Sequence, residues 1–159
     1  MNCQPDFLEL LCHSRPDAFA NISGNSDYPC LRGTACFYQV STGTLVKVEV
    51  CNLPFLSDDT PDAFYGMHIH AFGDCSLPFD KTGNHYNPYD LLHPMHLGDM
   101  PTLIGNNGYA YMIFYTERFQ VDDIINRSIV IHLLPDDFIT QPSGNSGEKI
   151  GCGVICPNL

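Results

Sequence analysis

Residues 34–50 read TACFYQVSTGTLVKVEV, and this stretch gives the clearest indication of the fold class. Its second half alternates strictly, with valine at positions 46, 48 and 50 and a charged residue between each pair. This period of two gives a strand one apolar face and one polar face. Both halves are rich in β-branched and aromatic residues, and a short connection containing Gly43 separates them. The stretch therefore predicts a β-hairpin with strands at 34–40 and 45–50.

Short runs of the same character recur on both sides of the hairpin. Strands are predicted at 18–22, 64–72, 109–115, 128–134 and 150–155, with single helical turns at 7–12 and 121–125. Two stretches rich in Gly, Pro, Ser and Asn lack periodicity and are predicted as long loops, at 73–103 and 136–148. Loops of such length in a compact domain usually carry function. Short strands, turn signals and the absence of a long helical pattern favour an all-β sandwich or barrel.

Size and charge narrow the possible functions. The chain has 159 residues, which we divide into an N-terminal extension, 1–16, and one domain, 17–159. A formal net charge of −11 repels phosphate groups, so we expect neither nucleic acid nor an anionic membrane as a partner. No apolar run approaches the roughly 20 residues that a transmembrane helix needs.

The cysteines bear on the cellular compartment. The chain has eight Cys but no CxxC pair, which argues against a zinc ribbon and a thioredoxin-like motif. Residues 1–13 show no basic start and only a short apolar run, so we expect no signal peptide. The sequence thus favours a cytoplasmic protein whose thiols are mostly free and buried.

The histidines are clustered. Five of the seven lie between residues 68 and 96, and His68 and His70 project from the same face of one predicted strand. His132 lies on another predicted strand, and three more histidines and Asp99 punctuate the long loop. Three imidazoles with a carboxylate suit a closed zinc site, and four imidazoles suit copper. Both sites can be built if one histidine uses its two ring nitrogens for two metals. His13 has no such neighbours.

Several segments together resemble the copper–zinc superoxide dismutase family, in the style of its bacterial members. They are GMHIH at 66–70, FGDC at 72–75, GNHYNP at 83–88, HPMHLGDMP at 93–101, IVIH at 129–132, PDD at 135–137, PSGNSG at 142–147 and GCGVI at 151–155. The resemblance covers about residues 17 to 156. It implies a Greek-key β-sandwich or flattened barrel of about eight antiparallel strands with two long functional loops.

The resemblance also implies which residues bind metals. Copper would be bound by His68, His70, His85 and His132, and zinc by His85, His93, His96 and Asp99, with His85 shared as an imidazolate. Asp136 would connect His68 to His93, although Asp137 stands next to it. Cys75 and Cys152 would form a disulfide.

The implied activity is the conversion of superoxide to oxygen and hydrogen peroxide by Cu(II)/Cu(I) cycling, with His85 holding a proton. The family usually has an arginine above the copper, and this chain has Lys149 at that position, beside Glu148. Lys149 is therefore the candidate guide for the superoxide anion, with Glu148 partly cancelling its field.

Other functions remain open from sequence. They are a non-catalytic copper-binding or zinc-stabilised member of the same scaffold and a zinc hydrolase, which would need an open zinc position that Asp99 here fills. Sandwich edges and exposed faces can support a homodimer, but the sequence displays no self-complementary patch.

Overall fold

The computed structural model describes residues 6–55 and 63–158 and is built mainly from short antiparallel strands. The strands are β1 (Ala18–Gly24), β2 (Arg32–Val40), β3 (Gly43–Cys51), β4 (Ala63–Tyr65), β5 (Met67–His70), β6 (Leu103–Gly105), β7 (Tyr109–Thr116), β8 (Ser128–His132), β9 (Lys149–Val154) and β10 (Cys156–Pro157). The helical segments are α1 (Phe7–His13), η1 (Asp80–Thr82) and α2 (Val121–Ile124). No helix in these ranges is long and apolar enough to cross a membrane.

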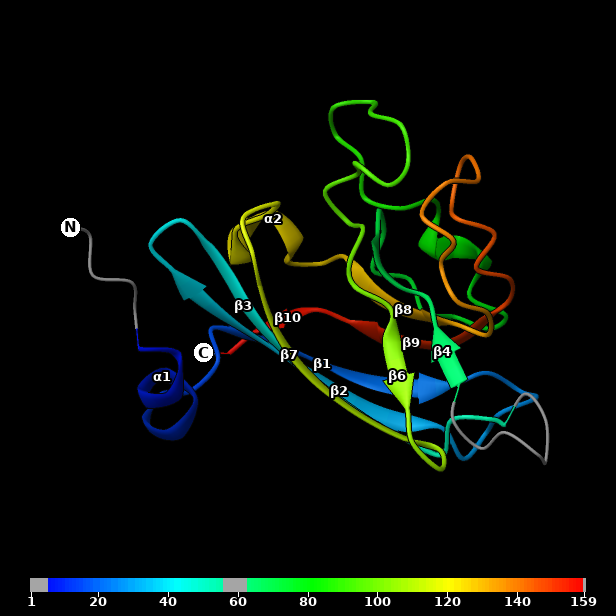
Figure 1. Ribbon diagram of the computed structural model, residues 1–159, viewed down its shortest axis with the longest axis horizontal. Helices are drawn as coiled ribbons and strands as arrows, with labels where there is room; N and C mark the ends of the chain where they lie inside the picture. The colour runs from blue at the N-terminus through cyan, green and yellow to red at the C-terminus, as the bar shows by residue number, and fades with distance from the viewer. Residues whose placement is uncertain (1–5, 56–62, 159) are drawn as a thin grey trace.

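One curled sheet of eight strands forms the body of the molecule (Figure 1). Its order is β5-β8-β9-β1-β2-β3-β7, β10 also pairs with β1, and β4 and β6 form a separate ribbon. The chain leaves the β1–β2–β3 meander for β4 and β5 and later returns from β7 through α2 to β8. These crossings between the two halves of the sheet are Greek-key connections. The all-β Greek-key prediction is confirmed.

The opening hairpin forms as predicted. β2 pairs with β3 from Arg32 opposite Cys51 to Val40 opposite Gly43, so the turn is tighter than the sequence suggested. The valines at 46, 48 and 50 are fully buried, and the charged residues between them are half-buried on the outer face. The buried valines belong to one continuous apolar core with isoleucines from β5 and β8. Period-two alternation therefore sets which face of the hairpin closes the barrel.

The strand predicted at 64–72 is wrong in one respect, because Gly66 divides it. β4 pairs with β6, whereas β5 pairs with β8, so the two pieces belong to different sheets. The Gly66 N–H donates to Leu134 O at 2.8 Å, and a Cβ on Gly66 would lie 2.8 Å from Ser146 Oγ. The segment has no room for a side chain there. The strands β6 and β10 were not predicted, since runs of two or three residues carry no readable period.

Two irregular segments, 71–102 and 133–148, lie together beyond the ends of β5 and β8 (Figure 1). The loop predicted at 73–103 thus contains η1, and its last residue already belongs to β6. The Cys75–Cys152 disulfide ties the first segment to β9, as the resemblance implied. It packs against Phe79 and Val130 in a small apolar cluster of its own.

The expectation of buried free thiols is wrong. Among the described residues the free cysteines are Cys12, Cys30, Cys36, Cys51 and Cys156, and each is exposed or half-buried. Cys36 lies on the outer face of the sheet because it pairs opposite Lys47, and Cys51 lies there because it follows Glu49 by two residues on β3. Cys3 lies outside the described residues.

Candidate metal centre

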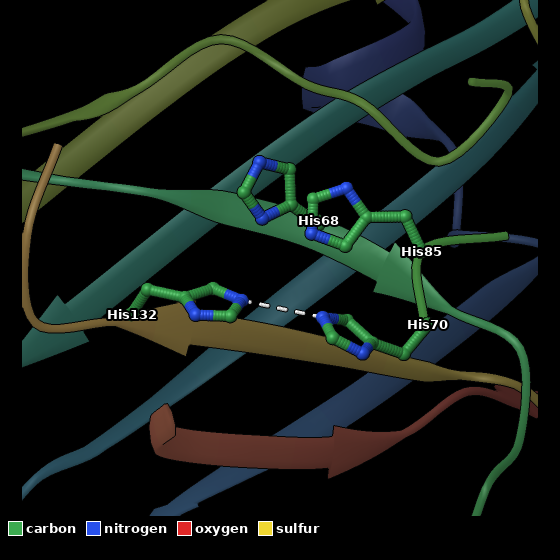
Figure 2. A group of neighbouring side chains, drawn as sticks. All are labelled: His68, His70, His85 and His132. Carbon is green, nitrogen blue, oxygen red and sulfur yellow. Dashed lines mark hydrogen bonds between the residues drawn. The ribbon is translucent and has the colours of Figure 1, made fainter. Parts of the chain in front are cut away.

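The first cluster of histidines gathers where β5 and β8 run side by side. β5 carries His68 and His70, β8 carries His132, and His85 joins from the loop through a bridge with His70 (Figure 2). All four side chains are buried, and one nitrogen from each lies within 4.8 Å of the others. The rings of His68 and His85 stack at 3.8 Å between centroids. The sheet and the loop together thus bring the four residues that the resemblance assigned to copper into one cluster.

Hydrogen bonds on the far side of each ring determine which nitrogen faces the cluster. His70 Nδ1 donates to Gly83 O at 2.8 Å and His132 Nδ1 to Gly147 O at 3.2 Å, so both rings present Nε2, with the two Nε2 atoms 3.2 Å apart (Figure 2). His68 instead bonds Asp136 through Nε2 and presents Nδ1. In the described part of the chain, His68 Nδ1 and His85 Nε2 are buried without a hydrogen-bond partner. Unpartnered buried nitrogens that converge on one point fit a metal ion.

The second cluster lies on the other side of the His85 ring. Asp99 is its centre: its oxygens lie 2.7 Å from His85 Nδ1, 3.1 Å from His93 Nδ1 and 3.3 Å from His96 Nδ1. The last two nitrogens have no hydrogen bond within the described residues. Three imidazoles and one carboxylate oxygen within 4.8 Å of one another suit zinc. His85 belongs to both clusters, with one nitrogen directed to each.

Asp136 connects the two clusters from outside. Its carboxylate accepts from His68 Nε2 at 2.7 Å and from His93 Nε2 at 2.9 Å, and all three side chains are fully buried. Burial alone would raise the pKa of Asp136, but the hydrogen bonds from His68, the Phe138 backbone and His93 lower it by more. The pKa of Asp136 therefore lies well below its ordinary value. The neighbouring Asp137 is exposed and instead caps the turn at Thr140. Asp136 therefore occupies the connecting position that the resemblance implied.

The three histidines on β5 and β8 are held neutral by burial. Burial lowers the pKa of His68 to about 4, although Asp136 opposes the shift, and lowers the pKa of His132 to about 3. Burial and the neighbouring His132 also lower the pKa of His70. The contact between His68 and Asp136 is consequently a hydrogen bond from a neutral ring to a carboxylate. Neutral imidazole is the form that binds a metal.

Lys149 lines the cavity of about 610 Å³ that opens over the first cluster, together with His70 and His132. Its half-buried ammonium donates to Thr82 Oγ1 at 2.8 Å and to Gly83 O at 3.2 Å. Burial lowers the pKa of Lys149, and the acid that opposes this shift is Asp80. Glu148, the acid beside it in the sequence, accepts from Asn25 Nδ2 at 2.8 Å.

Sequence reasoning missed two residues that support the site. Arg118 donates to Pro94 O at 2.7 Å and to His96 O at 3.0 Å, and so holds the segment that carries two histidines of the second cluster. Thr82 stands fully buried between Lys149 and His70. Neither residue belongs to a motif. The only available signal applies to Arg118: basic residues are scarce, with seven in the whole chain. His13 lies exposed on α1, far in sequence from both clusters.

Comparisons with known proteins identify the family of the chain. The family model described as copper/zinc superoxide dismutase matches residues 31–155. The curated relative superoxide dismutase (Cu-Zn) 3 of Arabidopsis thaliana is 30% identical over 155 residues, covering 87% of this chain and 88% of the relative. Superoxide dismutase (Cu-Zn) of Deinococcus radiodurans is 33% identical over 145 residues, covering 77% of this chain and 76% of the relative. Superoxide dismutase (Cu-Zn) 1 of Aquifex aeolicus is 31% identical over 139 residues, covering 77% and 79%.

Proposed function

The chain belongs to the copper/zinc superoxide dismutase family and is an enzyme that converts superoxide to oxygen and hydrogen peroxide with copper and zinc; we propose that the two buried clusters carry this reaction. In this proposal copper binds His68, His70, His85 and His132, and zinc binds His85, His93, His96 and Asp99. The single observation that supports it best is the position of His85. One ring places Nε2 in the first cluster without a partner and Nδ1 2.7 Å from Asp99 in the second.

When bound, copper supplies one-electron chemistry, taking an electron from one superoxide and giving it to another, while zinc has no redox chemistry and supplies charge and crosslinking. The residues of the protein hold a proton and orient the imidazole rings. His85 Nε2 is the atom placed to hold a proton for the peroxide product, and a zinc ion held by His85 Nδ1 and Asp99 would keep the ring from turning. Asp136 fixes the rings of His68 and His93 by accepting from their Nε2 atoms.

Lys149 has an electrostatic part in this proposal. Its ammonium lines the cavity over the first cluster in a chain whose net charge is −11, so it provides local attraction for a small anion.

Copper analysis, zinc analysis and superoxide dismutation on the same samples, before and after metal loading, test the function. We expect one copper and one zinc per chain and activity that depends on copper. Zinc alone, with no activity after copper loading, would reject the proposal in favour of a non-catalytic binding protein.

We further propose that the protein works in the cytoplasm. The support is the five free thiols among the described residues, of which Cys12, Cys30 and Cys156 are exposed. Exposed thiols persist in a reducing compartment and are oxidised outside it. Trapping thiols with an alkylating reagent in intact cells tests this. All five should be alkylated, and their recovery as mixed disulfides would count against a cytoplasmic location.

Superoxide is the substrate of the proposed reaction. We also propose that the protein forms a homodimer. Phe64 and Ile104 are paired across the β4–β6 ribbon and are both about half exposed, and β7 continues from this ribbon with exposed Tyr111 and Ile113. These uncharged side chains offer two acidic copies a contact with little repulsion. Light scattering should give twice the mass of the chain, and Ile104→Glu should halve it. A wild-type mass of one chain at high concentration would reject the dimer.

A further inference from the structure

The ammonium of Lys149 is surrounded by one short segment of chain. It lies 2.8 Å from Thr82 Oγ1, 3.2 Å from Gly83 O and 3.5 Å from Phe79 O. An ammonium has three N–H donors, so these three acceptors can engage all of them. The lysine therefore has a fixed place on the cavity wall, although its four-carbon stem is flexible.

Thr82 is the only side chain among the three acceptors, and its own orientation is fixed. It is fully buried, and its hydroxyl donates to Phe79 O at 2.8 Å. Since that proton is used, the oxygen is free to accept from Lys149 Nζ. The same oxygen lies 3.5 Å from His70 Nδ1, whose proton goes to Gly83 O at 2.8 Å. The hydroxyl thus stands between the lysine and a histidine of the first cluster.

We propose that Thr82 is a positioning residue for Lys149, holding the ammonium on the cavity wall beside His70 and His132, where an incoming anion would pass. A planar guanidinium carries its donors in a rigid fork, but an ammonium depends on its neighbours for direction. Thr82 supplies that direction through the shortest of the three contacts. This inference rests on the proposed function, since it concerns the attraction of the anionic substrate.

The charges around Lys149 explain why the position of its ammonium affects the attraction for an anion. In the described part of the chain, Lys149 is the only lysine or arginine that lines this cavity, and Asp90 lines it as well. The acid that acts on the ammonium is Asp80 of η1, which is exposed. A lysine released from Thr82 can move toward Asp80 and away from the cavity. The attraction for an anion at the cavity floor would then fall.

Azide, a small monovalent anion that binds Cu²⁺, is a suitable probe because its binding is read from visible absorption without turnover. Thr82→Val keeps the shape of the side chain and removes the hydroxyl, whereas Thr82→Ser keeps the hydroxyl. We expect Thr82→Val to weaken azide binding to the copper-loaded protein by roughly threefold to tenfold and to flatten its dependence on salt, while Thr82→Ser stays close to wild type. Equal azide affinity and salt dependence in wild type and Thr82→Val would overturn the proposal.

A second pair of variants separates action through Lys149 from direct action on the histidines. In a Lys149→Met background, Thr82→Val should cause no further change in azide affinity. The same loss in both backgrounds would mean that Thr82 acts on His70 itself, and would reject its role toward Lys149. If Thr82→Val fails to take up copper, the ¹⁵Nζ NMR signal of Lys149 is measured in the zinc-loaded protein instead. This signal should be sharp in wild type and in Thr82→Ser. Its absence from wild type would reject the proposal.

Failure of the proposed function has a different signature. A wild-type protein that binds copper and azide but does not dismutate superoxide would reject the enzyme while leaving the azide comparison of the Thr82 variants intact. Activity that is present in wild type and equal in Thr82→Val at every salt concentration would reject only the role of Thr82.

Discussion

The two clusters share His85 but are built by different parts of the molecule. In the first cluster three of the four histidines come from β5 and β8, whose backbones are fixed by a continuous ladder from Met67 opposite Ile131 to His70 opposite Ser128. In the second cluster every residue comes from the irregular segment 71–102. That segment is held by side-chain contacts, by one disulfide and by separate backbone hydrogen bonds, such as Tyr86 N–H to Ile69 O and Ile69 N–H to Gly98 O, whereas the strands are held by the sheet and the apolar core.

A rigid site and an adaptable site can therefore share one ligand. Strand positions keep their geometry without a metal because many backbone hydrogen bonds must break before they move. A loop with few apolar contacts depends on added crosslinks, and a metal can be one of them. Chelation should therefore loosen the second cluster first, with the first cluster retaining its backbone.

The largest expected effect comes from removing a strand histidine. His132→Ala should lower copper-dependent activity by at least about a hundredfold, because loss of a ligand should exceed the 10- to 100-fold cost of losing an outer partner. Zinc content should be unchanged, because His132 does not belong to the second cluster. Metal analysis and a dismutation assay check this, with His13→Ala as the control. Full copper and activity in His132→Ala would contradict the strand-built site.

The disulfide comes next, since it joins the loop to the strands. Cys75 and Cys152 are 77 residues apart in sequence, and a closed loop of that length stabilises a folded chain by about 4 kcal/mol in the chain-entropy account. The Cys75→Ala/Cys152→Ala variant should lose free energy of unfolding of this order in denaturant titrations, whereas Cys12→Ala should not. Hydrogen exchange should rise in 71–84 before it rises in β1 to β3; a uniform rise would contradict a separate loop layer.

The same division explains what could be predicted from the sequence. The hairpin at 34–50 and the strand faces followed from alternation, because a strand with one buried face has a period that can be read. The break at Gly66 could not be read, since it depends on Leu134 and Ser146, which come from the other irregular segment. The histidines were found by their clustering and spacing, and the resemblance then assigned them to two metals. The supports, Arg118 and Thr82, were not, because their partners are mostly backbone carbonyls and leave no pattern.

A smaller effect should appear when pH changes in the metal-free protein. Burial lowers the pKa of His68 to about 4 and that of His132 to about 3, whereas both should be near 6.5 in the unfolded chain. Between those values the unfolded chain binds protons that the native protein does not, so stability falls as pH falls below about 6.5. His68 alone should contribute a loss of about 3 kcal/mol by pH 4.

Denaturant titrations of the metal-free protein between pH 7.5 and pH 4 would measure this loss. The slope of unfolding free energy against pH should be shallower in His132→Ala than in wild type, because one buried histidine no longer opposes protonation. His13→Ala should keep the wild-type slope, since His13 is exposed on α1. Equal slopes in all three proteins would mean that these strand histidines do not remain neutral on folding.

The smallest expected effect concerns Arg118, and it addresses the loop cluster alone. The Arg118 guanidinium donates to Pro94 O and His96 O, so it holds the backbone on either side of Met95 without contacting a metal-binding atom. Arg118→Gln shortens the side chain and removes the charge, which should cost one or two hydrogen bonds from a charged donor. Hydrogen bonds of this kind contribute roughly 1 kcal/mol or more each, so zinc should bind about threefold to tenfold more weakly.

Copper affinity should change less, because three of its four proposed ligands come from strands that Arg118 does not hold. Competition with a zinc-binding dye would measure the change, with Arg15→Gln in the N-terminal extension as the matched control. If zinc and copper affinities fall equally, then loop and strands move together, and the two clusters form one unit rather than a rigid site beside an adaptable one.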